Sequence, residues 1–200
     1  MTRVRGALAG KQFFITGATG FLGTALVERF LRSVPDSRVV LLIRPGRRST
    51  PIQRATKEIL KNDCFDLLRQ QFGDRFDAEV ASRVSAVAGD VATDGLGLDD
   101  DGRRLLSECD VVVHSAASVS FDSPLDSAVE VNLLGPSRVA AAIVAAVGLA
   151  EGEGRRGPVH FIPVSTAYVA GTHQGEAREE LLEGNPFSVE VDWRTEVAAA

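Results

Sequence analysis

A run of glycines between a buried strand and an amphipathic helix constrains this chain more than any other feature. Glycines occupy positions 17, 20 and 23 of the segment Thr16–Gly23, TGATGFLG. The apolar run Gln12–Thr16 before it is typical of a buried strand, and residues 21–32 after it show helical spacing. Glycines here permit a tight turn, let the backbone approach a pyrophosphate and let the helix pack on the sheet. The segment therefore predicts a dinucleotide site, with a plain glycine turn as the alternative.

Four further apolar runs along the chain predict buried strands, at Arg38–Ile43, Val84–Ala88, Asp110–His114 and Val159–Ser165. Helical patterns lie between them, at residues 21–32, 51–72, 78–82, 99–107 and 123–147, the last with a kink expected at Gly135-Pro136. Buried strands that alternate with helices predict an α/β fold, a doubly wound parallel sheet of the Rossmann type. We expect an N-terminal tail (1–10), a dinucleotide-binding domain (11–172) and an acidic segment (173–200).

Composition excludes several classes of protein. The net charge of −5 gives no support for nucleic-acid binding, and the excess of acidic over basic residues falls in the last thirty positions. Two cysteines exclude a disulfide scaffold and a cysteine-rich zinc site, and they fit a cytoplasmic protein. The longest apolar run, Val139–Ala150, is shorter than a transmembrane helix needs, so we expect a core helix there and no transmembrane segment. The sequence leaves the oligomeric state open.

Arginines follow the second predicted strand, at the position where a side chain distinguishes NAD from NADP. Arg44, Arg47, Arg48 and Arg54 stand there with no acidic residue between positions 44 and 54. An acid at this position would bind the ribose hydroxyls of NAD, whereas a guanidinium group suits a 2′-phosphate. We therefore expect NADPH as the cofactor, with Arg44 as the first candidate ligand and Arg54 as a second. The alternative is a solvated basic loop.

Polar and small residues follow the other strands at the same edge of the sheet. Asp90, after the third strand, is placed to accept a hydrogen bond from adenine, or else to cap its own loop. The small residues after His114 leave room for a ligand, and His114 itself is expected to be a partly buried histidine at a strand end rather than a catalyst. Ser165 and Thr166 after the fifth strand offer a hydroxyl to a substrate carbonyl. No G-x-S-x-G motif surrounds Ser165, so a serine nucleophile is not expected.

At this point the chain resembles the fatty acyl-CoA reductases, a branch of the extended short-chain dehydrogenase/reductase family. The likeness is carried in order by ITGATGFLG and LLIRP, then VAGDV, VVVHSAASVSFD, VNLLGP and VSTAYVAG, and covers roughly residues 11–172. The resemblance implies NADPH-dependent reduction of a long-chain acyl-CoA, or of an acyl carrier thioester, to an aldehyde or primary alcohol.

The resemblance also assigns roles to single residues. It implies that Thr166, or else Ser165, contacts the reacting carbonyl, and that Asn132 lies on the helix behind the site. The cofactor-binding residues that it implies are Thr16, Gly17, Thr19, Gly20, Phe21, Leu22, Gly23, Arg44, Asp90, Val91, Ala116, Ala117, Ser118 and Asn132. No metal ligand is expected.

Such reductases also use a Tyr-x-x-x-Lys pair, which these 200 residues lack. Tyr168 is the only tyrosine, position 172 is threonine, and no lysine follows Lys61. We therefore expect the chain to be an N-terminal piece of a longer reductase that binds NADPH but is inactive alone. Two other hypotheses stay open: a nucleotide-sugar epimerase or dehydratase of the same fold, and a non-catalytic module that senses NADP(H).

Overall fold

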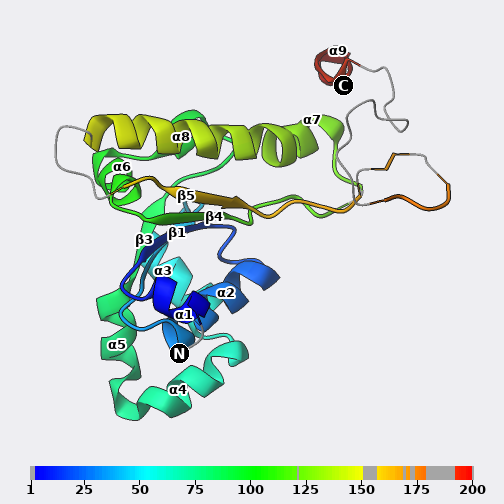
Figure 1. The fold of residues 1–200 in the computed structure, drawn as a ribbon. Coiled ribbons are helices and arrows are strands. Elements are labelled where there is room, and N and C mark those ends of the chain that lie inside the picture. Colours follow the sequence, from blue (N-terminus) through cyan, green and yellow to red (C-terminus); the bar gives the residue numbers. More distant parts are fainter. Residues whose placement is uncertain are drawn as a thin grey trace.

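The computed structural model describes residues 3–120, 122–150, 157–168, 170–171, 174–178 and 192–199. Their strands form one parallel sheet in the order β3-β2-β1-β4-β5 (Figure 1). The strands are β1 (Gln12–Thr16), β2 (Arg38–Ile43), β3 (Val84–Ala88), β4 (Val111–His114) and β5 (His160–Pro163). Every predicted strand is confirmed, although β5 is shorter than the apolar run that predicted it.

Helices precede, connect and follow these strands in chain order. They are α1 (Arg3–Leu8), α2 (Phe21–Ser33), α3 (Pro51–Ala55), α4 (Asp66–Phe72), α5 (Phe76–Arg83), α6 (Asp100–Ser107), α7 (Leu125–Ala128), α8 (Leu134–Ala150) and α9 (Trp193–Ala199). Two π-helical turns, Thr56–Leu60 and Val129–Leu133, and two 3₁₀ turns, Asp63–Phe65 and Gly73–Arg75, extend them, and a third 3₁₀ turn, Asp94–Gly97, lies between β3 and α6. Part of the segment expected as an N-terminal tail thus forms α1.

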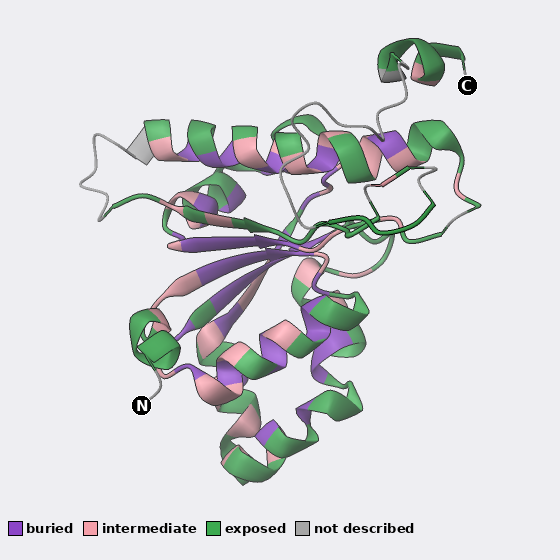
Figure 2. Cartoon of the chain, turned by 45° about the vertical axis from the view of Figure 1, so that its right-hand side comes forward, coloured by how far each residue is buried: buried purple, intermediate pink, exposed green. Residues whose placement is uncertain are grey.

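Strands β1, β2 and β4 are buried on both faces, whereas the edge strand β5 is largely exposed (Figure 2). Alternate residues of the buried strands enter different cores. Phe13 and Ile15 of β1 join the core beneath α2 and the α3–α5 segment, while Phe14 joins the core beneath α6 and α8. Strands buried on both faces need apolar residues at every position, which is why these runs show no polar alternation.

The segment expected as one polar helix over residues 51–72 is broken, and that expectation is corrected. A capping box of Thr50 and Gln53 starts α3, but the Asn62 side chain accepts the Cys64 N–H at 3.0 Å and starts a new turn. Arg69 donates to the carbonyls of Leu60 and Asn62, and so supplies hydrogen-bond donors to backbone carbonyls at the helix break. Local side-chain bonds of this kind compete with a continuous helix.

The helical stretch Leu125–Gly148 is continuous, with the π-helical turn Val129–Leu133 just before Gly135-Pro136, where a kink was expected. Its inner face packs on the sheet through Val139, Ile143 and neighbours. By length and composition this 24-residue stretch is long and apolar enough to cross a membrane. The expectation that no segment spans a membrane therefore stays a prediction.

The strand order fixes where a ligand can enter. From β1 the chain proceeds to β2 and β3 on one side of the sheet, and then returns to β4 and β5 on the other. The loops after β1 and β4 therefore leave the sheet toward opposite faces and open a crevice between them, at the carboxyl ends of the strands.

Candidate cofactor cleft

A cleft of about 420 Å³ lies in that crevice. Its walls come from the loops after β1, β2, β3 and β4 and from the start of the α7–α8 segment. A larger hollow of about 1010 Å³ lies at the opposite edge, where Lys11, Asp110 and His160 line it. We place the site in the smaller cleft, because it alone of the two combines the glycine loop, a helix N-terminus and arginines that follow β2.

The glycine loop fits a ligand backbone because side chains there are sterically forbidden. Gly17 has φ +69°, and a Cβ on it would lie 2.5 Å from the Ala116 nitrogen. A Cβ on Gly23 would lie 2.2 Å from the Gly17 carbonyl oxygen, so α2 packs directly on the loop. Gly20 caps α2 without a side-chain hydrogen bond, which leaves N–H groups of the helix N-terminus for an anion.

A buried polar network joins the ends of β1 and β4 beneath the loop. Thr16 Oγ1 lies 2.7 Å from His114 Nδ1 and accepts the Ala116 N–H at 3.3 Å. Ser115 Oγ donates to the Thr16 carbonyl at 2.8 Å. Burial lowers the pKa of His114, so the imidazole is neutral near pH 7 and shares one hydrogen bond with the Thr16 hydroxyl through Nδ1. His114 is therefore a structural residue here, as the sequence led us to expect.

Arg44 and Arg54 supply positive charge at the β2 side of the cleft. Arg54 makes a bidentate ion pair with Glu58, with both contacts at 2.9 Å, and also donates to the Arg44 carbonyl. The hydrogen bond from Arg54 lowers the pKa of the Glu58 carboxyl. The Arg44 side chain is exposed and takes no part in this pair, so Arg44 is the better placed of the two to meet a phosphate.

Asp90 and Val91 line the cleft at the end of β3. Asp90 Oδ1 accepts the Ala92 N–H at 2.9 Å, the loop cap considered as the alternative to adenine binding. A carboxylate has two oxygens, and no described contact uses Oδ2, so the cap and a ligand contact are compatible.

Asn132, in the π-helical turn, acts on the cleft through Ser118. Its side-chain oxygen accepts the Ser118 N–H at 2.8 Å, and its amide nitrogen donates to the Ser118 carbonyl at 2.9 Å. The pair of bonds fixes the loop after β4, and Asn132 itself does not line the cleft.

Most of the predicted cofactor residues meet in this one cleft. Those that line it are Gly17, Thr19, Gly20, Arg44, Arg54, Asp90, Val91, Ala116, Ala117 and Ser118. Thr16 and Gly23 lie buried behind it, and the Phe21 side chain is 97% exposed at the start of α2, beside Leu22. The residues that sequence reasoning missed are Leu42, Ile43, Gly89, Ser115, Ser127 and Val131.

Ser165 and Thr166 follow β5 at the same edge of the sheet but do not line the cleft. Both are exposed, and Thr166 Oγ1 accepts the N–H of Tyr168 at 3.0 Å. Their contact with a substrate stays a prediction. Within the described residues, no cluster of histidine, cysteine, aspartate or glutamate is placed to hold a metal ion.

Comparison with known proteins decides the family. Residues 15–197 match the model of the NAD-binding family described as male sterility protein. The chain belongs to that family. Its membership agrees with a cleft built around the glycine loop, and it identifies the domain as one that binds a nicotinamide cofactor.

Relatives of this male sterility family domain include reductases. The chain is 32% identical over 205 residues to the chloroplastic fatty acyl-CoA reductase 2 of Arabidopsis thaliana, in a match that covers 96% of the chain and 32% of that protein. The terminal R domain of the myxalamid biosynthetic pathway shares 28% identity at a TM-score of 0.62, over 88% of this chain and 40% of that one. The reductase domain of a non-ribosomal peptide synthetase from Mycobacterium tuberculosis shares 30% identity at a TM-score of 0.55, over 84% and 38%. The chain thus spans about a third of the length of the curated relatives it matches.

Proposed function

We propose that this chain is the NADP(H)-binding part of a reductase that acts on long-chain acyl thioesters. The observation that carries the cofactor choice is the Arg44 side chain, which is exposed at the cleft while Arg54 is paired with Glu58. A guanidinium group binds a 2′-phosphate through charge and paired hydrogen bonds, and would find no such partner on NADH.

Different residues bind different parts of the cofactor. The glycine loop and the N-terminus of α2 hold the pyrophosphate, Arg44 holds the 2′-phosphate, and Asp90 accepts from adenine. Loop 115–118, fixed by Asn132, lines the path of the nicotinamide ribose. When bound, NADPH supplies the hydride that reduces the thioester carbonyl.

The substrate assignment rests on relatives named fatty acyl-CoA reductase and on reductase domains of related fold. In this assignment the Thr166 hydroxyl donates to the reacting carbonyl oxygen, where negative charge develops. These residues lack the tyrosine–lysine pair of such reductases, so we propose that the chain binds NADPH and that reduction needs further residues.

Substitution of Arg44 tests the cofactor choice. We expect Arg44→Ala to weaken NADPH binding by about tenfold or more, the scale of one lost charged hydrogen bond, and to leave NADH binding within about twofold. Isothermal titration of the full chain with each cofactor measures both constants. Arg38→Ala, at the other end of the same strand, is the matched control. Equal losses for NADPH and NADH, or no loss for either, would contradict the assignment.

A further inference from the structure

The loop that carries Asp90 has an unusual backbone. Gly95, Leu96 and Gly97 follow one another with φ of 59°, 60° and 61°. This left-handed conformation is unfavourable for leucine, but the Leu96 side chain is fully buried in the core beneath α8. The Leu96 carbonyl accepts the Asp90 N–H at 2.9 Å. The turn at Leu96 therefore sets the direction in which Asp90 leaves β3.

A single arginine outside the cleft ties this loop to the opposite wall. Arg138 of α8 places Nε 3.1 Å from Asp94 Oδ1, next to the left-handed turn. One terminal nitrogen lies 2.7 Å from Glu130 Oε2 and donates to the Glu130 carbonyl at 3.1 Å. Glu130 belongs to the π-helical turn whose Asn132 holds Ser118. Arg138 thus contacts both segments that flank the adenine end.

The contacts of Arg138 are suited to positioning rather than to ligand binding. Its side chain is 20% exposed and does not line the cleft, and all its described polar contacts go to Asp94 and Glu130. Close by, Gly135 of α8 faces Val91, since a Cβ on Gly135 would lie 3.5 Å from the Val91 side chain, an ordinary van der Waals contact. The loop and the helix are therefore close together at two points.

We propose that Arg138 is a positioning residue that holds the Asp90–Val91 segment at the distance from α8 that the adenine end of the cofactor requires. This inference rests on the proposed function, because it assumes that NADP(H) binds in the cleft. Without Arg138 the loop keeps its core anchor at Leu96 but loses its link to the π-helical turn.

The test uses the full chain and adenosine 2′,5′-bisphosphate, which carries the adenine and the 2′-phosphate without the nicotinamide. Arg138→Met removes the donors and keeps an apolar stem, and Asp94→Ala removes only the acceptor on the loop side, at a side chain that is 97% exposed. We expect each to raise the Kd by about two- to fivefold, the scale of one exposed ion pair. The double variant should bind no more weakly than Arg138→Met, because both changes break one link.

Arg104→Met is the control, since Arg104 also contacts two acids, Asp101 and Glu108, but these lie on or next to its own helix α6. It should leave the Kd unchanged. A purely structural role of Arg138 would lower the melting temperature and leave the Kd close to that of the unsubstituted chain, and that result would overturn the inference. Losses that multiply in the double variant would overturn it too. Absence of binding by the unsubstituted chain would instead refute the proposed function, and the positioning role with it.

Discussion

At the scale of single residues, the burial of His114 predicts that the stability of the fold depends on pH. His114 is 1% exposed at the end of β4, and the buried Thr16 hydroxyl is its described hydrogen-bond partner. Burial lowers its pKa in the folded chain, so the unfolded chain binds the proton more readily. A fall in pH through about 6.5, the ordinary pKa of histidine, therefore favours unfolding.

Unfolding in urea at about pH 7.5 and 5.5, either side of that pKa, measures this effect. We expect the unsubstituted chain to lose about 1 kcal/mol more stability over that interval than His114→Asn, which keeps an acceptor but does not titrate. His160→Asn, at an exposed histidine of β5, should behave like the unsubstituted chain. The same pH dependence in the His114 variant and the unsubstituted chain would show that His114 contributes nothing.

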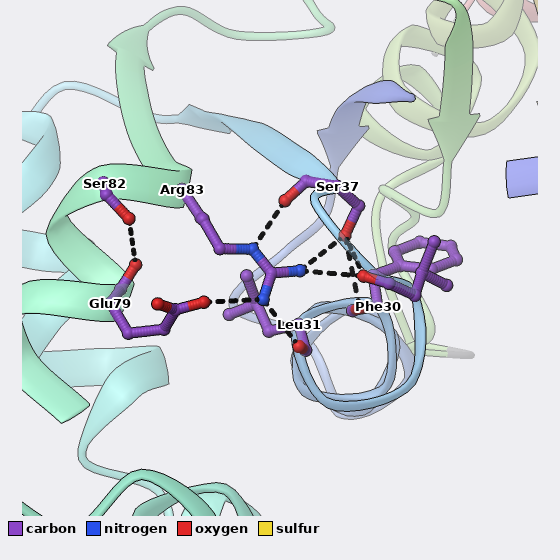
Figure 3. Close-up of polar contacts among 7 residues, drawn as sticks. Phe30, Leu31, Ser37, Glu79, Ser82 and Arg83 are labelled. Atoms are coloured by element: carbon purple, nitrogen blue, oxygen red, sulfur yellow. Dashed lines mark hydrogen bonds and ion pairs between the residues drawn. The ribbon is translucent and has the colours of Figure 1, made fainter. Parts of the chain in front are cut away.

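At the scale of elements, α2 is anchored at its far end by Arg83 of α5 (Figure 3). The guanidinium group donates to the carbonyls of Leu31, Val34 and Ser37 at 2.7–3.0 Å and contacts Glu79 at 3.1 Å. Carbonyls at a helix C-terminus have no hydrogen-bond donor within the helix, so Arg83 supplies donors to the last carbonyls of α2. The helix whose N-terminus faces the cleft is thereby fixed to the α4–α5 layer.

We expect Arg83→Met to lower the free energy of unfolding by roughly 2–3 kcal/mol, because it leaves several partly buried carbonyls without a donor. Arg29→Met, on the exposed face of the same helix α2, should change it by less than about 0.5 kcal/mol. Urea denaturation of both variants provides the comparison. Similar values for the two would show that water replaces the guanidinium group without cost.

The sequence predicted the elements whose residues are uniformly apolar. It did not predict the places where a side chain hydrogen-bonds the nearby backbone and interrupts a helix. The apolar runs of β1, β2 and β4 are buried on both faces, so composition alone located them. The break at Asn62 depends on which backbone groups a side chain reaches, and no period in the sequence reveals that. The left-handed turn at Leu96 is not predicted either, because leucine disfavours that conformation and only its packing in the core reveals it.

At the scale of the whole molecule, the sheet topology brings the predicted site residues together at one edge. Gly17, Arg44, Asp90 and Ala116 follow four different strands, and parallel order brings their loops to one edge. Ser127 and Val131 come from a helix that returns over the cleft, and the sequence held no sign of which of its faces turns inward. Residues 179–191, the middle of the acidic segment, lie outside the described residues, so the expectation about that segment is not tested.

Every proposed role depends on NADP(H) binding at the carboxyl edge of the sheet. Titration of the isotope-labelled full chain with NADP⁺, followed through backbone amide resonances, tests it most directly. We expect saturable shifts at residues 17–20, 44, 89–91 and 115–118, with Lys11, Asp110 and His160 in the opposite hollow unaffected. Shifts centred on that hollow, or no saturable shifts in the glycine loop, would contradict it.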